Sequence, residues 1–502
     1  MTAERSSLVD RFLVVTARDP ASAAITDDVE RVAFPELRER SLRVAGALVE
    51  AGLSGERVGL LVTQGSGWLE AFFGCVLAGA TVVPLSPLHP EAEQRWFVET
   101  SRASALIVSE ELAHRVAPYA GARPVLDVAA LRRHDARAPE RPSADEEVAV
   151  ILYTSGTTGK PKGALLSHEN LVSAARLLAA AWQWSEQDVL LHCLPLHHLH
   201  GLGIALLTSL LAGGETRMLE RFDAARVWEE LGAATVFMGV PTMHKKLLDA
   251  LDAADDATRA RWRSHAARLR LVTSGSAALP TTIGERWRAL TGAYPLERFG
   301  MTEIGVGMSN PVAGERRPGS CGKELPGMRI RIVDERGADV PPGAPGEIWI
   351  QGPSVIQGYD GNPTATREAF HDGWFKSGDT ATWLDDGYAK ILGRTSVDIL
   401  KSGGYKLSAL EIEETLREHA AVADVAVVGI PDETWGEVAV AAVIARGEHA
   451  SELEEARLRD WAKERLAAYK VPKRVLLFEE FPRNPVGKVV KPALVKLVAA
   501  RL

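Results

Sequence analysis

Cysteine is scarce in this sequence, and its pattern excludes two classes of site. The 502 residues include only Cys75, Cys193 and Cys321, which are far apart and match no metal-ligand spacing. This usage excludes a disulfide framework and indicates a reducing compartment. The first 28 residues carry Asp10, Asp19, Asp27 and Asp28 and no apolar stretch, so we expect neither a signal peptide nor a transit peptide. We therefore expect a cytoplasmic protein.

Long apolar runs and excess basic charge are also missing. No uncharged apolar run reaches about 18 residues, so we expect no membrane-spanning segment. The formal net charge is −8, which argues against nucleic acid or an anionic membrane as partner. At 502 residues the chain exceeds the size of one core, so we expect two or more domains.

The densest polar motif lies at residues 153–163, which read Tyr-Thr-Ser-Gly-Thr-Thr-Gly-Lys-Pro-Lys-Gly after an apolar run predicted to be a buried strand. Glycines permit close approach of the backbone, hydroxyls and N–H groups donate to oxyanions, and lysines add charge. The spacing is not that of a Walker A loop. The alternative is a flexible surface turn, but we interpret the motif as a polyphosphate loop. Its candidate contacts are Thr154, Ser155, Gly156, Thr157, Thr158, Gly159, Lys160, Pro161 and Lys162.

The rest of the first 300 residues alternates between apolar runs and helical patterns, which predicts parallel βαβ units. Ser167 is positioned to cap a helix, and Pro241 to open one. Polar loops at 195–201, 274–278 and 297–303 each follow a predicted strand. Ligands collect at the carboxyl ends of strands in open α/β sheets, so we expect these loops to line a site.

Beyond residue 328 the pattern changes to antiparallel strands, with a polar turn predicted at residues 373–379. From about residue 396 onward the order reads βαββαβ, which is enough for a small separate domain. We therefore predict two domains, residues 1–395 and 396–502.

Several loops carry groups suited to a nucleotide. Asp379 can accept two bonds from a ribose diol, and Phe299 can stack on a base. Glu303 beside Thr302 can hold Mg²⁺, which prefers oxygen ligands. Lys488 offers a mobile positive charge. Each has a plainer reading, as a turn aspartate, a helix-terminal acid or a surface lysine, so their order and co-occurrence carry the interpretation.

Three histidines lie close together at His197, His198 and His200. Such spacing invites a zinc site, but no further cysteine or carboxylate lies at a usual distance along the chain. We favour a role in lining a pocket, because the run joins a strand end to a glycine-rich helix start.

Five motifs in this order resemble the adenylate-forming superfamily of acyl-CoA synthetases, peptide-synthetase adenylation domains and luciferases. They lie at residues 153–163, 298–303, 377–379, 393–394 and 485–488. Within that superfamily the chain most resembles malonyl-CoA and methylmalonyl-CoA synthetases, especially the animal mitochondrial type. The matching stretches are 194–201, 274–280, 297–305, 393–411 and 424–436.

The resemblance implies an α/β fold: a large N-terminal domain of stacked α/β sheets plus a β-barrel-like subdomain, and a small mobile α+β C-terminal domain. It implies a two-step reaction in which a carboxylate attacks the α-phosphate of ATP with Mg²⁺, and the thiol of coenzyme A then displaces AMP. We expect a monomer or homodimer.

The same resemblance implies roles for single residues. The loop at 154–162 would hold the β- and γ-phosphates, and Lys488 would bridge the substrate carboxylate and the α-phosphate. The other implied contacts are Thr302 for the α-phosphate, Glu303 for magnesium, Ser276, Ala277 and Phe299 for adenine, Asp379 and Arg394 for ribose, and Ser402, Gly403 and Gly404 for CoA. Ser396 stands where the family often has a hinge Asp or Lys.

The acyl substrate remains open among three hypotheses. A dicarboxylate such as malonate or methylmalonate needs a cation in the pocket. Candidate partners are Lys246, Arg286 and His200, although Lys246 also suits a solvated helix face. The wider acyl set is His198, His200, Lys246, Ser274, Gly275, Arg286 and Met308, with His198 also a catalytic candidate. The alternatives are a ligase for a monocarboxylic fatty or aryl acid and a stand-alone adenylation enzyme that loads a carrier protein, although we expect no carrier segment in this chain.

Overall fold

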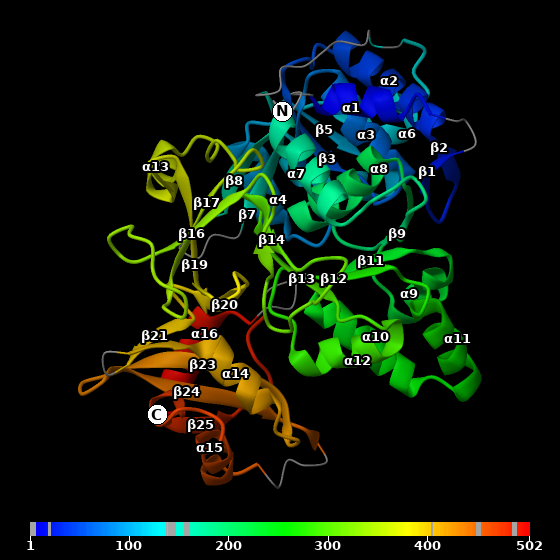
Figure 1. Ribbon diagram of the computed structural model, residues 1–502. Helices are drawn as coiled ribbons and strands as arrows, with labels where there is room; N and C mark the ends of the chain where they lie inside the picture. Colours follow the sequence, from blue (N-terminus) through cyan, green and yellow to red (C-terminus); the bar gives the residue numbers. More distant parts are fainter. Residues whose placement is uncertain are drawn as a thin grey trace. The chain divides into compact units, whose positions relative to one another are not determined.

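The chain forms two compact units. The first comprises Met1–Arg329 and Ile350–Phe375, and the second comprises Ile330–Trp349 and Lys376–Leu502. The computed structural model describes residues 7–18, 22–136, 138, 147–154, 161–402, 405–447, 453–483 and 489–502 (Figure 1). The sequence-based boundary between residues 395 and 396 stays a prediction.

The first sheet of the first unit has the strand order β6-β5-β3-β4-β7-β8. Neighbouring strands from β6 to β7 run parallel, and only β7 and β8 are antiparallel. This confirms the predicted βαβ units. The strands are β3 (Arg57–Leu61), β4 (Thr81–Pro84), β5 (Ala105–Val108), β6 (Val125–Asp127), β7 (Val148–Thr154) and β8 (Lys162–Ser167). The helices between or beside them are α2 (Phe34–Glu50), α3 (Ser66–Leu77), α4 (Glu91–Thr100), α5 (Ala113–Ala120) and α6 (Val128–Leu131).

The second sheet has the order β15-β14-β13-β12-β11-β9-β10-β1-β2. Its central strands run parallel, so their carboxyl ends lie at one edge of the sheet. The loops that follow these strands therefore start from the same edge, as predicted. The strands are β1 (Ala23–Thr26), β2 (Arg31–Ala33), β9 (Val189–His192), β10 (Glu215–Met218), β11 (Val236–Gly239), β12 (Leu271–Ser274), β13 (Leu296–Met301), β14 (Gly305–Ser309) and β15 (Lys323–Glu324).

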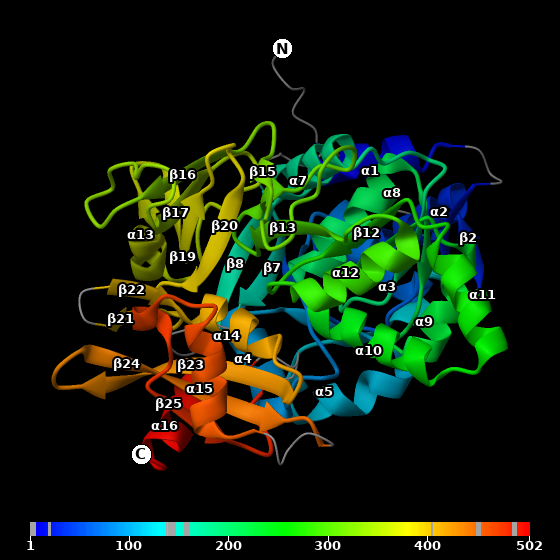
Figure 2. The same cartoon turned by 60° about the horizontal axis from the view of Figure 1, so that its bottom comes forward.

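A cluster of buried aromatic and aliphatic side chains joins this sheet to four helices, which lie together near β12 in both views (Figures 1 and 2). The helices are α9 (Ala224–Glu230), α10 (Pro241–Ala253), α11 (Asp256–Ala266) and α12 (Thr281–Thr291). The indole rings of Trp228 and Trp287 stack in this cluster with centroids 5.5 Å apart. Stacked tryptophans bury large apolar areas, so this pair stabilises the packing of α9 and α12 in the cluster.

The remaining helices of the first unit are α1 (Leu8–Val15), α7 (His168–Ala181), α8 (Thr208–Ala212) and α13 (Pro363–Ala369), with a π-helical turn at His200–Leu207. Ser167 caps α7 as predicted, because its side chain accepts a hydrogen bond from the Asn170 N–H. Pro241 opens α10 as predicted. None of the helices among the described residues is long and apolar enough to cross a membrane.

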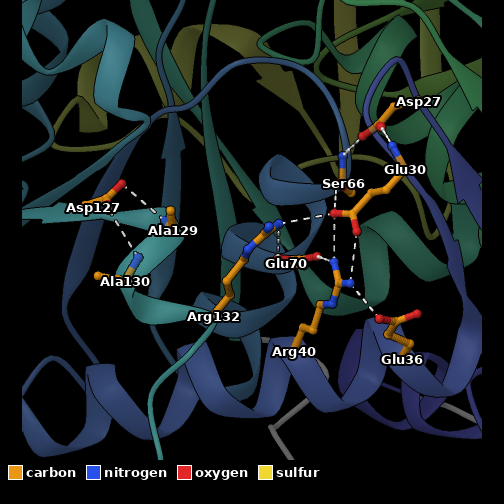
Figure 3. A network of polar contacts seen from close by, with 10 residues as sticks. All are labelled: Asp27, Glu30, Glu36, Arg40, Ser66, Glu70, Asp127, Ala129, Ala130 and Arg132. Atoms are coloured by element: carbon orange, nitrogen blue, oxygen red, sulfur yellow. Dashed lines mark hydrogen bonds and ion pairs between the residues drawn. The ribbon is translucent and has the colours of Figure 1, made fainter.

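A partly buried network of acidic and basic side chains links α2, α3 and the end of α6 (Figure 3). The Arg40 guanidinium lies 2.8 Å from a carboxylate oxygen of Glu30 and 3.0 Å from one of Glu70. Arg132 reaches the same two carboxylates at 3.2 Å and 3.6 Å. Because Glu70 is fully buried, these partners compensate a charge that has lost its water.

The third sheet contains β16 (Arg329–Val333), β17 (Gly346–Gln351), β18 (Phe370–His371), β19 (Trp374–Trp383) and β20 (Ala389–Arg394). Strand β19 corrects the predicted polar turn at residues 373–379, which holds only at Gly373. Phe375, Ser377 and Asp379 are buried and the residues between them are partly exposed. An alternation of burial with a period of two is typical of a strand. The polar Ser-Gly-Asp sequence had led us to predict a turn.

The C-terminal part of the second unit is a sheet of order β22-β21-β24-β23, with β25 paired to β24. Its elements are β21 (Ile399–Ser402), β22 (Tyr405–Ser408), α14 (Ala409–Arg417), β23 (Val422–Asp432), β24 (Gly436–Ala445), α15 (Glu455–Lys463), β25 (Arg474–Leu477) and α16 (Lys491–Ala499). Val425 and Val427 face a core shared with α14 and α15, whereas Ala426 and Val428 face a core shared with α16. The β21–β22 hairpin and α16 were not predicted.

Candidate functional site

The polyphosphate motif begins at the end of β7 and finishes at the start of β8. Thr154 and Lys162 are register partners, and the Thr154 hydroxyl donates to the Lys162 carbonyl at 3.4 Å. This pairing brings the two ends of the motif together. Ser155, Gly156, Thr157, Thr158, Gly159 and Lys160 lie outside the described residues, and Pro161 is partly exposed.

Tyr359 connects this motif to the predicted magnesium residue. The Nζ atom of Lys162 lies 5.3 Å from the centroid of the Tyr359 ring. The hydroxyl of the same tyrosine donates a hydrogen bond of 3.0 Å to Oε1 of Glu303. The segment is anchored next to Tyr359, where Asp360 forms two hydrogen bonds with the Arg57 guanidinium, each 2.8 Å long. Tyr359 was not among the predicted site residues.

Thr302 and Glu303 follow β13, at the shared carboxyl edge of the parallel strands. Glu303 is buried and Thr302 is partly exposed. No group of three or more histidine, cysteine or acidic side chains suited to a metal occurs among the described residues. A single carboxylate still fits Mg²⁺ in a nucleotide complex, because this ion keeps several waters and takes substrate phosphates as its other ligands.

The loop after β12 carries the predicted adenine contacts Ser276 and Ala277, both of which are exposed. Ser276 has a φ of 67°, a left-handed conformation that is uncommon for residues other than glycine. Such strain persists where surrounding contacts impose it, often at ligand sites. Here the Ser276 hydroxyl lies 3.3 Å from Nδ1 of His200. The other predicted adenine contact, Phe299, is buried on β13.

Arg298 on β13 is a buried cation that the sequence analysis did not assign to the acyl site. Its guanidinium Nε and Nη2 atoms have no hydrogen-bond partner among the described residues. Burial lowers the pKa of Arg298 to about 10. The side chain lies against Gly275, where an added Cβ would be 2.5 Å from Cζ of Arg298. Gly275 is therefore required for this arginine to occupy its position.

Two predicted acyl residues near this arginine also present unpaired atoms. Within the described part of the chain, Nε2 of His200 and Oγ of Ser274 are buried without a hydrogen-bond partner. Burial, and then the charge of Arg298, hold the pKa of His200 well below its usual range. His200 therefore stays neutral at physiological pH. Buried polar groups left unpaired in a protein normally have a ligand or water as partner, so this cluster has the character of a binding site.

Other acyl candidates are placed less favourably. Lys246 is exposed on α10, and Arg286 is an exposed residue of α12 that pairs with Asp252 at 2.6 Å. Neither supplies a buried cation in this structure, because each lies on the solvated side of its helix. Met308 is fully buried on β14 and is the register partner of Phe299. His198 is partly exposed, and its ring is tilted against that of His197 with ring centroids 4.1 Å apart.

Sequence signals for Arg298 were present but ambiguous. The residue stands in an apolar strand, Leu-Glu-Arg-Phe-Gly-Met, where a cation is unexpected. The carboxylate of its neighbour Glu297 accepts the N–H of Gly319 at 2.8 Å.

The predicted ribose residues lie together in the second unit. Asp379 on β19 and Arg394 on β20 are register partners, and Nε of Arg394 lies 3.1 Å from Oδ1 of Asp379. The same guanidinium donates to the Ser377 carbonyl at 2.7 Å. The pair presents a fixed carboxylate of the kind that accepts hydrogen bonds from a diol.

The remaining predicted contacts are only partly described. Ser402 is the last residue of β21, while Gly403, Gly404 and Lys488 lie outside the described residues. The residues on either side of Lys488 are placed, since Arg483 and Val489 form a β-bridge.

Comparisons with known proteins match nearly the whole chain. Residues 12–360 match the AMP-binding enzyme family, and residues 411–488 match the AMP-binding enzyme C-terminal domain. The mitochondrial malonate–CoA ligase of Mus musculus is 42% identical over 94% of this chain and 88% of its own. The malonate–CoA ligase of Arabidopsis thaliana is 40% identical over 88% of this chain and 78% of its own.

Solved structures give the same family. ATP-bound MatB from Rhodopseudomonas palustris superposes with a TM-score of 0.89 at 33% identity, covering 97% of this chain and 98% of its own. The o-succinylbenzoate CoA synthetase of Bacillus subtilis, in complex with ATP and magnesium ion, superposes with a TM-score of 0.84 at 27% identity, covering 96% of this chain and 98% of its own. The α/β fold with a large N-terminal and a small C-terminal domain, expected from the motifs, is confirmed by these likenesses. The chain belongs to the AMP-binding enzyme family.

Proposed function

We propose that this enzyme is an AMP-forming acid–thiol ligase that converts malonate, ATP and CoA into malonyl-CoA, AMP and diphosphate. The observation that carries the choice of substrate is the buried guanidinium of Arg298, whose Nε and Nη2 atoms have no partner among the described residues. The malonate–CoA ligases among the relatives support the same choice.

The electrostatic argument concerns the second carboxylate of the acid. A buried charge is costly unless an opposite charge and hydrogen bonds compensate it. The distal carboxylate of malonate would give Arg298 a bidentate partner. His200 and Ser274 would add hydrogen bonds through Nε2 and Oγ, which lack partners within the described residues. A monocarboxylic acid would leave Arg298 buried and uncompensated, so it should react more slowly.

The two half-reactions then follow from ordinary carbonyl and phosphoryl chemistry. The proximal carboxylate attacks the α-phosphorus of ATP, the bond from that phosphorus to the bridging oxygen breaks, and diphosphate leaves. The acyl carbon, now bound to a good leaving group, is attacked by the CoA thiol, and AMP departs. Positioning and charge stabilisation supply most of the catalysis in such phosphoryl transfer.

We assign the nucleotide contacts as follows. The motif at 154–162 holds the β- and γ-phosphates, Thr302 the α-phosphate, and Asp379 with Arg394 the ribose. Lys488 stabilises the charge that develops in the first half-reaction. The further assignments are Ser276, Ala277 and Phe299 to adenine, Ser402, Gly403 and Gly404 to CoA, and His198 to the reacting acyl group.

Glu303 is the residue we assign to magnesium. Its buried carboxylate is held in one orientation by the Tyr359 hydroxyl. When bound with ATP, Mg²⁺ neutralises charge on the departing diphosphate.

Met308 bears on the size of the acid. It is fully buried beside Phe299 and fills space next to the strand that carries Arg298. We therefore favour malonate over methylmalonate, and an acid with a bulky substituent should be excluded.

We further propose that the enzyme works in a reducing compartment such as the cytoplasm, as a monomer or homodimer. Cys75, Cys193 and Cys321 are buried and unbridged. Burial raises the pKa of Cys75 and of Cys193 to about 12, so neither is a ready thiolate. Cell fractionation and analytical ultracentrifugation test these two points.

A diphosphate-release screen tests the proposed function. The acids are malonate, methylmalonate, acetate, butyrate, octanoate and benzoate, each with ATP, Mg²⁺ and CoA. We expect malonate to give the highest kcat/KM and formation of its thioester with CoA. If octanoate or benzoate outruns malonate, the enzyme is a monocarboxylate ligase instead.

A further inference from the structure

The buried side chain of His192 joins the end of β9 to the π-helical turn at His200–Leu207. His192 is the last residue of β9, and only 1% of its surface is exposed. Its Nε2 atom lies 3.0 Å from the carbonyl oxygen of Gly201, nine positions further along the chain. This contact closes the polar loop at 195–201, which the sequence analysis placed in the site.

The partners of His192 determine which of its ring nitrogens carries the proton. A carbonyl oxygen only accepts hydrogen bonds, so Nε2 of His192 donates to Gly201. Nδ1 of His192 lies 3.4 Å from Nε2 of Gln64, and an amide nitrogen only donates, so Nδ1 accepts. Burial lowers the pKa of His192 to about 4. The ring is therefore neutral at physiological pH, with its proton directed at Gly201.

Backbone contacts fix the two ends of this arrangement. Gln64 lies in the loop between β3 and α3, and its Nε2 also donates to the carbonyl of Leu219 at 3.0 Å. The N–H of Leu219, which follows β10, donates in turn to the carbonyl of His192 at 2.9 Å. The orientation of the imidazole ring is therefore tied to both sheets of the first unit.

The backbone at the start of the π-helical turn has little room to move. A Cβ added at Gly201 would lie 2.3 Å from the carbonyl oxygen of Pro195, so the turn packs directly against the loop that follows β9. π-Helical backbone is rare and occurs frequently at functional sites. The carbonyl of Gly201 is one peptide beyond His200, so a shift of this carbonyl would also move His200.

His200 is the acyl-site residue that the turn carries. Its Nδ1 atom lies 3.3 Å from the Ser276 hydroxyl, and its buried Nε2 atom has no hydrogen-bond partner among the described residues. Burial, and then the charge of Arg298, lower the pKa of His200, so the field of the arginine reaches this ring. The direction of Nε2 depends on where the backbone of His200 is held.

We propose that His192 is a positioning residue that determines acid specificity: by holding the carbonyl of Gly201, it sets the direction in which His200 presents Nε2 to the second carboxylate of the acid. This inference rests on the proposed function, because it assumes a dicarboxylate beside Arg298. Both ring nitrogens of His192 have protein partners, so His192 acts through His200 and not on the acid itself.

The test measures kcat and KM of the full-length enzyme for malonate and for butyrate, with ATP, Mg²⁺ and CoA. His192→Phe keeps a flat ring and removes both nitrogen atoms. Loss of a hydrogen bond to a charged group costs about 10-fold or more. Because misplacement weakens this bond without removing it, we expect the malonate-to-butyrate ratio of kcat/KM to fall by about 3- to 10-fold. The change should lie in the KM for malonate, while the KM for ATP stays unchanged.

Two further variants separate positioning from folding. His192→Gln places an amide N–H near the position of Nε2 and should restore most of the ratio. Gln64→Met alters a partly exposed residue, so it should fold, and it removes the amide that orients His192. Its ratio should fall by about two- to threefold, because only the weaker of the two contacts of the ring is lost.

His168→Phe is the matched control. His168 is also a buried histidine, but it lies at the start of α7, outside the assigned site. Any loss of activity in this variant should be the same for both acids, so its malonate-to-butyrate ratio should equal that of the wild type.

A double-mutant cycle tests whether His192 acts through His200. His200→Leu should lower the malonate-to-butyrate ratio by about 10-fold. Adding His192→Phe should lower it no further, because the side chain that His192 positions is already missing. Such non-additivity is the expected sign of two residues that act as one unit.

Three results would overturn the inference. Equal losses for both acids in His192→Phe would make His192 a purely structural residue. An unchanged ratio in both His192→Phe and Gln64→Met would show that these contacts position nothing. Fully additive effects of His192→Phe and His200→Leu would show that His192 does not act through His200.

The wild type distinguishes these failures from failure of the proposed function. A wild-type enzyme that does not prefer malonate to butyrate would overturn the proposed function, and this inference with it. A wild-type enzyme that prefers malonate, with the ratio unchanged in the His192 and Gln64 variants, would overturn this inference alone.

Discussion

The phenol hydroxyl of Tyr359 donates a hydrogen bond of 3.0 Å to Oε1 of Glu303, across 56 positions of sequence. The ring of the same tyrosine lies under Nζ of Lys162 at 5.3 Å. One side chain thus holds the residue assigned to magnesium and the last lysine of the phosphate motif. The two residues therefore share Tyr359 as a common neighbour.

Tyr359→Phe is expected to weaken magnesium binding without affecting the thiol step. The variant keeps the ring beneath Lys162 but removes the hydroxyl that orients Glu303. Loss of such a supporting hydrogen bond usually costs about 10-fold or more in metal affinity. We expect the Mg²⁺ concentration for half-maximal diphosphate release to rise about 10-fold, while thiol transfer from the acyl-adenylate stays unchanged.

Tyr119→Phe is the matched control for that measurement. It also removes a buried tyrosine hydroxyl, which donates to Gln94 at 2.6 Å in the helices beside the first sheet. It should leave the magnesium dependence unaltered. An unchanged magnesium requirement in Tyr359→Phe would remove the case for Glu303 as the metal residue.

Neutral buried histidines should make the protein sensitive to acid. Burial lowers the pKa of His168, His192 and His244 to about 4, and that of His197 to about 2. Below the unfolded pKa of about 6.5, the unfolded chain takes up protons that the folded protein does not. Stability is therefore full above about pH 6.5 and falls by about 1.4 kcal/mol per pH unit for each such histidine, until the folded pKa is reached.

His168→Gln measures one of these contributions, because His168 lies at the start of α7, outside the assigned site. In chemical unfolding between about pH 4.5 and 7, the free energy of unfolding should fall less steeply with decreasing pH in the variant than in the wild type. The difference in slope should correspond to the uptake of roughly one proton on unfolding. His371→Gln, an exposed histidine, serves as control. A slope in His168→Gln equal to that of the wild type would contradict a neutral His168.

The network in Figure 3 predicts opposite effects for two of its members. Burial raises the pKa of Glu70, so folding disfavours its charged form and this cost appears as pH rises through the folded pKa. Glu70→Gln should therefore be neutral or stabilising at pH 8, and less so at pH 5. Arg40→Met removes one of the two guanidinium groups that Glu30 and Glu70 share, leaving them with Arg132, and should cost about 3 kcal/mol. Thermal unfolding at both pH values distinguishes the two, and marked destabilisation by Glu70→Gln at pH 8 would contradict the argument.

Local signals predicted much of this fold. The alternation of strands and helices, the cap at Ser167 and the helix start at Pro241 depend on a few neighbouring residues, and all are confirmed. The same alternation of strands and helices predicts parallel pairing. Parallel pairing in turn predicts that the site loops gather at the carboxyl edge of the sheet. The predicted turn at 373–379 was wrong because it was based on the polar residue types. Buried and partly exposed side chains alternate along this segment with a period of two, as in a strand.

What the sequence concealed depends on contacts between distant segments. Tyr359 contacts Lys162 and Glu303 only in the folded protein, and no spacing in the sequence predicts these contacts. The sequence shows an arginine at position 298, but it does not show that two of its guanidinium nitrogen atoms are buried without a hydrogen-bond partner among the described residues. Lys246 and Arg286 were predicted as partners of a second carboxylate because of their positive charge. Both are exposed to solvent in the folded helices, which the sequence alone did not show.

The ratio of kcat/KM for malonate to that for butyrate, in the wild type and in Arg298→Leu, tests the central claim most directly. Arg286→Gln and Lys246→Gln, which remove exposed cations, are the controls. Loss of a buried partner to a charged group costs about 2–5 kcal/mol, or roughly 30-fold or more. We predict that the ratio falls by at least about that factor in Arg298→Leu and changes little in the controls. A ratio that is unchanged in Arg298→Leu, or that falls in a control instead, would contradict the assignment of Arg298 to the second carboxylate.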